Sequence, residues 1–428
     1  MKTRDKIRID RWLGYPTAAG LNLIARVLGK TLHRDHAVGT DNVRAIAVAK
    51  FLGMGSIIQS TPLLRALRRT YPEARIIFVT GKGNRTLIER LAEVDEAIYI
   101  DDTDTATLSV STLAAVRALI ERKIDLYFDL EVYSANASIL ALCAVSRNRY
   151  GFYRWSARFK DGIYTHLVYF NPRRPIAALY LQLGIAAGAQ DDGVALSRIQ
   201  IRDEDRAGAS RKLEAAGVAP GAPYLVVNAN ASDLLLERRW PAQHFVAALE
   251  QLARGGHRVL LIGAPDEAEY VRSIHARLSA GARALVVDFA GQVSLAELFA
   301  VVDGAACVIT NDTGPMHVAF SLDRPTVCLF GPQAPEHYGA AKANVATLYA
   351  GIVCSPCIFE IEEPPCAGNN VCMKIIEPAA VVAAVERLLS GADARSTMAN
   401  GVTLRRDAAG RPLGMVVRRS LEESSAHE

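Results

Sequence analysis

The sequence predicts an α/β protein with two Rossmann-like domains whose parallel sheets face a cleft. Short apolar runs alternate with helical segments, and this alternation occurs in two blocks, at 43–195 and at 223–390. Strands that alternate with helices of about 10–15 residues are typical of βαβ units and parallel sheets. Because such sheets bind ligands at the carboxyl ends of their strands, we expect the functional site in the cleft.

The first block contains four predicted strands. They lie at 44–51, 75–80, 97–101 and 124–130. A glycine-containing loop at 52–56 follows the first strand and leads into a helix predicted at 57–70, with Pro62 near its first turn. Proline is tolerated there because the amide hydrogens of a first turn have no partner within the helix.

The second block repeats this scheme with five predicted strands. They lie at 224–230, 258–264, 284–291, 307–312 and 326–331. The expected organisation is therefore an amphipathic leader at 1–42, an N-terminal domain at 43–195, a linker at 196–222, a C-terminal domain at 223–390 and a polar tail at 391–428.

The composition excludes several classes of protein. Half of the 428 residues are apolar and 22% are charged, which suits buried cores and argues against bulk disorder. The net charge of +4 is slight, and the chain has no nucleic-acid motif, so we expect no nucleic acid as a partner. No apolar run approaches the roughly 20 residues of a membrane-spanning helix. The first residues lack the features of a signal peptide, so the expected location is cytoplasmic.

The leader combines basic, aromatic and aliphatic residues over 9–34. A stretch of this kind can lie in a membrane interface. It can equally form a helix that packs on the protein's own surface, and Gly14, Pro16 and Gly20 weaken any long helix. Both interpretations stay open at this point.

Four of the seven cysteines cluster near the end of the second block. They are Cys354, Cys357, Cys366 and Cys372. In a reducing cytoplasm such a cluster favours a metal over disulfides, but its spacing is irregular for a zinc ribbon. A structural zinc and free or reversibly paired thiols are the two interpretations.

The most informative segment is a junction between a strand and a helix. An apolar strand ends at Asp312, and Thr313, Gly314 and Pro315 then open a helix in which His317 follows one turn later. Either Thr313 or Gly314 can cap this helix, and Pro315 suits its first position. The free amide hydrogens and the positive end of the helix dipole predict a binding site for a diphosphate.

This junction resembles a known family signature. Residues 311–339, NDTGPMHVAFSLDRPTVCLFGPQAPEHYG, are similar to that of bacterial glycosyltransferase family 9, in which D-T-G-x-x-H is followed by a strand and F-G-P-x-x-P. Residues 47–80 resemble the family's opening strand, loop and T-P-x-L-x-x-L helix. Residues 238–252 resemble its K/R-x-W-P-x-x-x-F stretch, and 262–271 its G-x-x-x-E donor loop. The likeness covers about 43–390 in the same order.

The resemblance implies a fold and a reaction. Its members have the two-domain GT-B fold, need no divalent metal or other cofactor for catalysis, and mostly transfer heptose from ADP-heptose within the lipopolysaccharide core. We therefore expect an inverting, metal-independent transfer of heptose or a related sugar from a nucleotide-diphosphate donor to a lipopolysaccharide or other cell-surface glycan. A lipid-linked glycan acceptor also implies a peripheral contact with the cytoplasmic face of the inner membrane.

The resemblance assigns most of the donor site to the second domain. The diphosphate would meet Thr313, Gly314 and the helix start, with Ser232 on the facing loop. Arg238 or Arg239 matches the basic position that neutralises charge on the departing diphosphate. Such cations matter in a metal-free transfer, because the leaving group gains negative charge in the transition state.

Three further residues complete the implied donor site. Glu267 matches a carboxylate that holds ribose or sugar hydroxyls, and Asp312 and His317 match the pair nearest the donor sugar. Each of them can instead be an ordinary solvated residue at the end of a strand or helix.

The acceptor loop departs from the family pattern. The family's loop normally reads G-D, and its Asp is the proposed base for the acceptor hydroxyl. Here Gly53 and Gly55 are present, but Ser56 stands where that Asp is expected, and serine cannot serve as a base at neutral pH without a partner. Glu131, at the end of the fourth strand, is the candidate substitute, with an ordinary polar strand end as the alternative.

Three other functions compete with glycosyl transfer. A nucleotide-sugar 2-epimerase also uses two Rossmann-like domains, and a non-catalytic nucleotide-sugar binder is compatible with Ser56. A metal-dependent transferase of the single-domain type needs a D-x-D at a strand end. Asp102 and Asp104 have that spacing, but they lie in an acidic segment predicted as a loop, and the second Rossmann block argues against that class.

Overall fold

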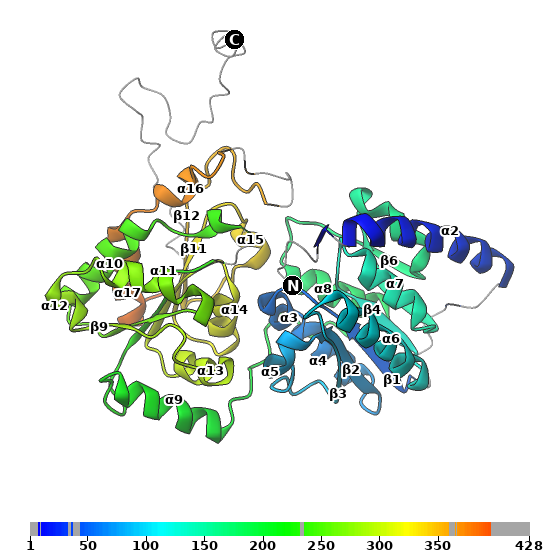
Figure 1. Cartoon of the computed structure of the whole chain (residues 1–428), viewed down its shortest axis with the longest axis horizontal. Helices are drawn as coiled ribbons and strands as arrows, with labels where there is room; N and C mark the ends of the chain where they lie inside the picture. Colours follow the sequence, from blue (N-terminus) through cyan, green and yellow to red (C-terminus); the bar gives the residue numbers. More distant parts are fainter. Residues whose placement is uncertain are drawn as a thin grey trace, which may run out of the picture. The chain divides into compact units, whose positions relative to one another are not determined.

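The computed structural model describes residues 7–8, 10–32, 36, 43–231, 235–358, 364 and 366–394. The chain divides into two compact units, Met1–Asp203 and Glu204–Glu428, each built around one six-stranded parallel sheet (Figure 1). The predicted pair of parallel α/β units is therefore confirmed. The boundary falls inside the range expected as a linker, where 203–215 form a helix, α9 (Asp203–Ala215).

The first unit has the strand order β3-β2-β1-β4-β5-β6. Its strands are β1 (Ala45–Ala49), β2 (Arg75–Gly81), β3 (Glu96–Ile100), β4 (Leu126–Asp129), β5 (Asn148–Tyr153) and β6 (His166–Tyr169). The four predicted strands are all present, and β5 and β6 are additional. Neither has a long apolar run: polar residues and a glycine interrupt β5, and β6 has only four residues at the edge of the sheet.

Helices cover both faces of this sheet. They are η1 (Asp10–Gly14), α2 (Tyr15–Leu32), α3 (Met54–Gln59), α4 (Thr61–Thr70), η2 (Lys82–Asn84), α5 (Arg85–Ile88), α6 (Thr105–Glu121), α7 (Ala135–Cys143), η3 (Trp155–Ile163) and α8 (Ile176–Ala186). The helix predicted at 57–70 begins earlier, at Met54, and breaks at Ser60 into α3 and α4. Pro62 lies in the first turn of α4, as expected.

The second unit has the strand order β12-β11-β10-β7-β8-β9. Its strands are β7 (Leu225–Asn228), β8 (Val259–Ile262), β9 (Val286–Asp288), β10 (Cys307–Asn311), β11 (Thr326–Phe330) and β12 (Val345–Tyr349). All five predicted strands are confirmed, and β12 is an edge strand that the sequence did not reveal. Its helices are η4 (Leu236–Arg238), α10 (Ala242–Arg254), η5 (Pro265–Glu267), α11 (Ala268–His275), α12 (Ala280–Arg283), α13 (Leu295–Asp303), α14 (Gly314–Ser321), α15 (Pro335–Tyr338), α16 (Val371–Lys374) and α17 (Pro378–Leu389).

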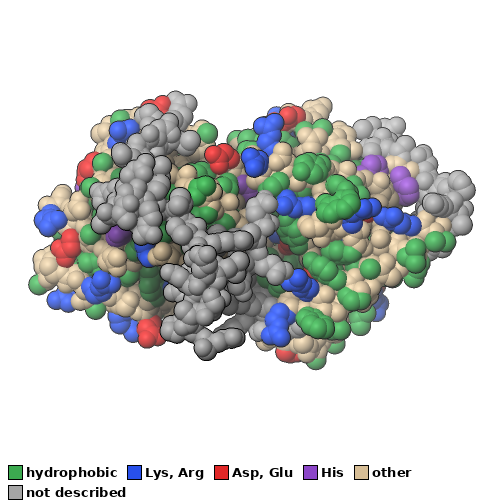
Figure 2. Space-filling model, turned by 90° about the horizontal axis from the view of Figure 1, so that it is seen from above, with side chains coloured by type: hydrophobic (Ala, Val, Ile, Leu, Met, Phe, Trp, Pro, Cys, Tyr) green, Lys and Arg blue, Asp and Glu red, His purple; other side chains and the backbone are tan. Residues whose placement is uncertain are grey.

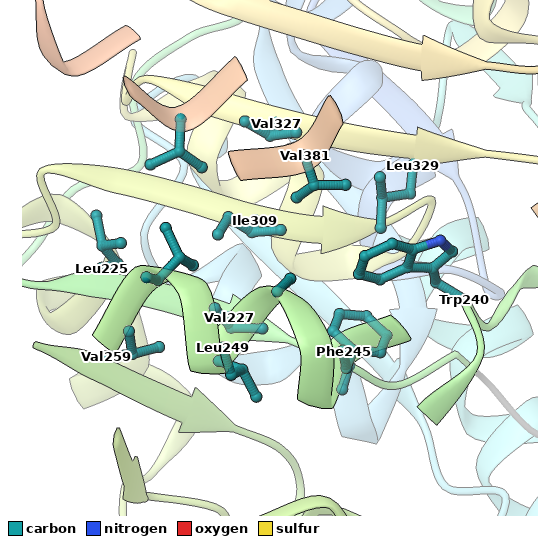
Figure 3. Packing of buried hydrophobic residues seen from close by; sticks show 14 of the residues in the cluster. Leu225, Val227, Trp240, Phe245, Leu249, Val259, Ile309, Val327, Leu329 and Val381 are labelled. Atoms are coloured by element: carbon teal, nitrogen blue, oxygen red, sulfur yellow. The ribbon is translucent and has the colours of Figure 1, made fainter. Parts of the chain in front are cut away.

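A hydrophobic core lies between this second sheet and helices α10 and α17 (Figure 3). Its largest member is Trp240, which is fully buried and stacks edge-on against Phe245 with ring centroids 4.9 Å apart. Around them lie aliphatic residues of the central strands, Ile309 and Leu329 among them. Truncating a buried tryptophan to alanine typically costs about 3–5 kcal/mol, so Trp240 is a major anchor of the segment that precedes α10.

Each sheet has one pair of neighbouring strands at which the direction of the connections reverses. In the first unit this pair is β1 and β4, and in the second it is β7 and β10. The helices that follow such a pair leave toward opposite faces of the sheet, so the carboxyl ends of the pair stay uncovered. The loops after these four strands are therefore the first places to look for a site.

The leader packs on the first unit. Ala18 of α2 is fully buried and belongs to the same core as Ala135, Ile163 and Tyr164. This contact agrees with the interpretation in which the leader forms a helix on the protein's own surface. Among the described residues, no helix combines the length and apolar character needed to cross a membrane.

Candidate functional site

The strand end at β10 forms a buried ion pair in the second unit. Asp312 is only 4% exposed. Arg238 donates from Nη1 to the Asp312 backbone oxygen at 3.0 Å and lies 3.6 Å from its Oδ2. Burial raises the pKa of Asp312, and the Arg238 guanidinium opposes that rise. Two residues separated by 74 positions in the sequence therefore meet where β10 ends.

The helix that follows begins without a side-chain cap. Thr313 is the N-cap of α14, but its hydroxyl makes no capping hydrogen bond. Instead Thr313 Oγ1 accepts from Asn228 Nδ2 at 2.8 Å, and so it points toward the end of β7. The cap of α13 shows the usual alternative, because there Ser294 Oγ accepts from the Glu297 amide. Thr313 thus leaves the start of α14 without a side-chain cap, Pro315 has no amide hydrogen, and the Met316 amide donates to the Thr313 backbone oxygen at 3.1 Å. The predicted diphosphate site at this helix start stays a prediction.

Asn311, the last residue of β10, connects two loops of the second unit. Asn311 donates from Nδ2 to the backbone oxygens of Ala229 and Asn230 at 3.1 and 3.0 Å, and its Oδ1 accepts from the Trp240 amide at 3.1 Å. The Trp240 indole nitrogen donates to Ile376 O at 2.9 Å. Asn311 therefore ties the loop after β7 to the segment that carries Arg238.

The second arginine lies beside the loop after β8. The Arg239 guanidinium stacks 4.1 Å from the centre of the Tyr270 ring. Asn370 Nδ2 donates to the Arg239 backbone oxygen at 2.8 Å. Glu267 Oε2 accepts from the Ala264 amide at 2.9 Å. Burial raises the pKa of Glu267, and Arg239 opposes that rise. Arg239 and Glu267 thus influence each other electrostatically, and the two neighbouring arginines have different surroundings.

His317 lies in the buried face of α14. It is 3% exposed and makes edge-on contacts with the rings of Phe320 and Tyr338. Burial lowers the pKa of His317 to about 3, with a smaller contribution from Arg238 in the same direction. The imidazole is therefore neutral at physiological pH.

The first unit also has a buried charged group at its reversal point. Glu131, after β4, accepts on Oε1 from the Phe51 and Leu52 amides at 2.9 and 3.0 Å, and Lys50 Nζ lies 2.8 Å from the same oxygen. Burial acts to raise the pKa of Glu131, but Lys50 and these amides outweigh it, so the pKa is lowered. The carboxylate thus binds the loop that follows β1.

A second layer of polar contacts supports Glu131. Lys160, which is fully buried, donates to the Glu131 backbone oxygen at 2.8 Å. Asp129 accepts from the Glu131 amide at 2.9 Å and from the Tyr164 hydroxyl. Burial raises the pKa of Asp129 to about 6 despite the opposing charge of Lys160. Two lysines and two carboxylates therefore form one buried network under the loop.

The loop itself leads into α3. Gly53 has a φ of +84°, a left-handed conformation that strongly favours glycine, and it is the N-cap of the helix that contains Gly55 and Ser56. Ser56 hydrogen-bonds with the buried Tyr180 hydroxyl of α8. The predicted acceptor-loop residues thus lie directly above the Glu131 network.

The structure groups the predicted residues within each unit. Asp312, His317, Thr313, Gly314 and Arg238 share the start of α14 or its immediate surroundings, Arg239 and Glu267 lie around the end of β8, and Gly53, Gly55, Ser56 and Glu131 lie around the end of β1. Ser232 lies outside the described residues. Their partners that were not predicted include Lys50, Asn228, Asn311 and Tyr270. The asparagines carried a signal, since each ends an apolar strand.

The four clustered cysteines are all free. Burial raises the pKa of Cys357 to about 11, and Cys354 and Cys366 add to that rise, so these thiols influence one another. Among the described residues, no three or more metal-binding side chains are arranged to hold a metal ion. A structural zinc thus stays a prediction from the sequence.

Comparison with known proteins gives a consistent result. The sequence model of glycosyltransferase family 9 (heptosyltransferase) matches 112–364. Lipopolysaccharide heptosyltransferase 2 of Salmonella typhimurium is 26% identical over 314 residues, which cover 70% of this chain and 86% of that protein.

Two solved structures have a similar fold. A glycosyl transferase family 9 protein from Veillonella parvula has a TM-score of 0.70 at 24% identity, covering 82% of this chain and 98% of its own. The ADP-heptose lipopolysaccharide heptosyltransferase II of Escherichia coli has a TM-score of 0.66 at 20% identity, covering 81% and 99%. The predicted two-domain architecture of GT-B type is confirmed. The 2-epimerase alternative is not favoured, because the matching family consists of transferases.

The burial of His317 predicts a pH dependence of stability. Its pKa of about 3 in the folded chain lies below the 6.5 of an unperturbed histidine, so between these values the unfolded chain binds a proton that the folded chain does not. Stability is therefore lost as the pH falls below 6.5. This group should lower the free energy of unfolding by about 1.4 kcal/mol between pH 7.5 and 5.5.

Urea unfolding at both pH values measures this effect. His317→Gln lacks the contribution, so the stability difference between the wild type and this variant should change by that amount between the two pH values. An identical pH dependence in the two proteins would show that His317 is not held neutral in the fold.

Proposed function

Because the chain belongs to glycosyltransferase family 9, we propose that it transfers heptose or a related sugar from a nucleoside-diphosphate donor to a lipopolysaccharide-type acceptor. The observation that carries this proposal is the uncapped start of α14, where the Thr313 hydroxyl points away and Arg238 is held by Asp312. The names of the similar proteins, which specify lipopolysaccharide, heptose and ADP-heptose, support this choice of substrates.

The diphosphate of the donor is proposed to bind at the start of α14. Helix amides and the helix dipole attract anions, and Arg238 adds a full positive charge at the same place. When the acceptor hydroxyl attacks the anomeric carbon, the bond to the diphosphate breaks and the leaving group gains charge. Arg238 and Arg239 are proposed to stabilise that charge, with Ser232 assigned to the facing loop by the family resemblance alone.

Asp312 and His317 have complementary proposed roles. Asp312 fixes the Arg238 guanidinium through its backbone oxygen and its carboxylate. His317 is neutral, so it can hydrogen-bond with a sugar hydroxyl without adding a positive charge beside the arginine. Glu267, whose pKa is raised by burial, is proposed to accept from ribose or sugar hydroxyls when ionised.

Glu131 is proposed as a positioning residue. A general base works best with a pKa near the operating pH, whereas the pKa of Glu131 is lowered and its Oε1 already accepts from two amides and from Lys50. These contacts support a role in holding the acceptor loop at Gly53, Gly55 and Ser56. The earlier expectation, in which Glu131 replaces the family's Asp as base, is tested by the same variants.

Two further proposals concern metal and location. A structural zinc bound by Cys354, Cys357, Cys366 and Cys372 is supported by their clustering, and metal analysis of the purified chain tests it. The reaction itself is proposed to need no cofactor beyond the nucleotide-sugar. Because the proposed acceptor is lipid-linked, a peripheral location at the cytoplasmic face of the inner membrane is also proposed.

Turnover is expected to depend on the residues around the start of α14. With ADP-heptose and a core-lipid acceptor, we expect ADP release only when the acceptor is present. Asp312→Ala and His317→Ala should each reduce that release by about a hundredfold or more, since each removes a preorganised contact to the donor. Glu214→Ala, on exposed α9, serves as the control. Full turnover in both variants, with donor binding intact, would refute the assignment of this site.

The arginines should act on phosphate specifically. Arg238→Gln combined with Arg239→Gln is expected to weaken ADP binding by about tenfold or more and adenosine binding far less, because charge-assisted bonds to phosphate are lost. Removing two exposed arginines of the same unit, with Arg254→Gln and Arg283→Gln, controls for net charge. Calorimetric titration measures all three proteins, and equal losses for the two ligands would rule out phosphate contacts.

Two substitutions at Glu131 separate positioning from base catalysis. In Glu131→Gln the amide oxygen can still accept from Phe51 and Leu52, so turnover should fall by about tenfold or less, whereas Glu131→Ala should lose about a hundredfold. Lys50→Met with Glu131→Gln removes both charges of the buried pair and should recover part of the stability that Glu131→Gln loses. A loss of a hundredfold or more in Glu131→Gln, with its fold intact, would instead identify Glu131 as the base.

A further inference from the structure

The leader has two faces with different properties. Its inner face packs on the first unit through the buried Ala18 and through several hydrogen bonds. Asp10 accepts from the Ala135 and Asn136 amides at 3.0 and 2.7 Å, so it caps α7 together with Ser134. The Tyr15 hydroxyl donates to Tyr133 O at 3.1 Å. These contacts reach the loop between β4 and α7, only a few residues after Glu131.

The helix itself is held closely along the same side. Asn22 Oδ1 accepts from the Gly162 amide at 2.5 Å, and Tyr15 stacks on Phe159 with ring centroids 4.2 Å apart. A Cβ at Gly162 would collide with the side chains of Asn22 and Arg26. The orientation of α2 is therefore fixed, and so is the side that it turns to solvent.

The outer face is apolar, which is the reverse of an ordinary surface helix. Five of its large side chains are between 54% and 78% exposed: Trp12, Leu13, Leu23, Ile24 and Val27. The adjacent η3 adds Trp155, which is 73% exposed and has the Arg158 guanidinium 4.7 Å from its ring centre. We call these six residues the leader surface.

Basic residues predominate around the leader surface. Between Arg11 and Val27 the leader carries Arg11 and Arg26 and no acidic residue, the preceding Asp10 turns inward to α7, and Asp161 of η3 lies 3.7 Å from Arg158. Figure 2 shows hydrophobic and basic side chains intermingled on the first unit, with few acidic ones. A second copy of this chain would bring like charges together, whereas an anionic bilayer complements them.

From this geometry we propose that the leader surface docks in the interface of an anionic lipid bilayer. Exposed tryptophans and aliphatic side chains, accompanied by arginines, are features of a helix that lies in the plane of a membrane. Because the inner face of the same segment holds the β4–α7 loop, docking brings the acceptor loop of the first unit close to the lipid. This last step depends on the proposed function, whereas the docking itself does not.

Vesicle binding of the full chain tests the docking. Cosedimentation is measured with vesicles of phosphatidylcholine alone and with added phosphatidylglycerol. The wild type should bind the anionic vesicles, and raised salt should weaken that binding. Leu23→Ser with Ile24→Ser should reduce the affinity for anionic vesicles by about tenfold or more, because the wild-type leucine and isoleucine would be buried in the apolar layer of the bilayer.

A matched control comes from α6 of the same unit. Val110 and Leu113 are 69% and 71% exposed, so Val110→Ser with Leu113→Ser removes the same kind of surface elsewhere. This variant should bind anionic vesicles like the wild type. Equal affinities for the two double variants, or equal affinity of the wild type for neutral and anionic vesicles, would overturn the proposal.

A transferase assay in detergent distinguishes a failure of the docking proposal from a failure of the proposed function. With a detergent-solubilised acceptor, Leu23→Ser with Ile24→Ser should release ADP like the wild type, because no bilayer is involved. If the wild type binds vesicles but releases no ADP from any donor, the proposed function fails and the docking stands.

Discussion

The reversal of strand connections at one pair of strands in each sheet is the constraint on which the rest of this structure depends. It leaves the carboxyl ends of that pair uncovered, and their backbone groups then need polar partners from other loops. Glu131 supplies such a partner in the first unit, where it accepts from two amides of the loop after β1. Asn311 supplies it in the second, where it donates to two carbonyl oxygens after β7. A charged side chain serves one unit and a neutral one serves the other.

This difference has a consequence for the chemistry of each unit. In the second unit the neutral Asn311 fixes the backbone, so the charged pair of Arg238 and Asp312 stays at the start of α14, where an anion would bind. In the first unit the buried charges offset one another. Glu131 and Asp129 are balanced by Lys50 and Lys160 within the same buried network. The buried charges of the first unit therefore offset one another below the loop after β1, whereas the second unit carries Arg238 and Asp312 at the start of α14.

The sequence predicted the central strands because burial on both faces demands continuous apolar runs, which β1, β10 and β11 have. It did not predict β5, β6 and β12, which lie at or near sheet edges, where polar residues and glycine are tolerated. The residues of the β10–α14 junction could be recognised because they are contiguous. Contacts between distant residues could not be recognised. Lys50 lies 81 residues from Glu131, and Asn228 lies 85 residues from Thr313, so only the fold brings each pair together.

The balance of charge also gives Ser56 a physical context. Tyr180 is influenced by the charges of Glu131 and Asp129 and hydrogen-bonds with Ser56, so Ser56 lies beside a network in which two lysines already neutralise two carboxylates. An aspartate at 56 would add a third carboxylate next to a buried phenol, with no further cation to offset it among the described contacts of that network. A serine satisfies Tyr180 without this charge. The departure from the family's G-D loop is therefore compatible with the residues that surround the loop after β1 in this chain.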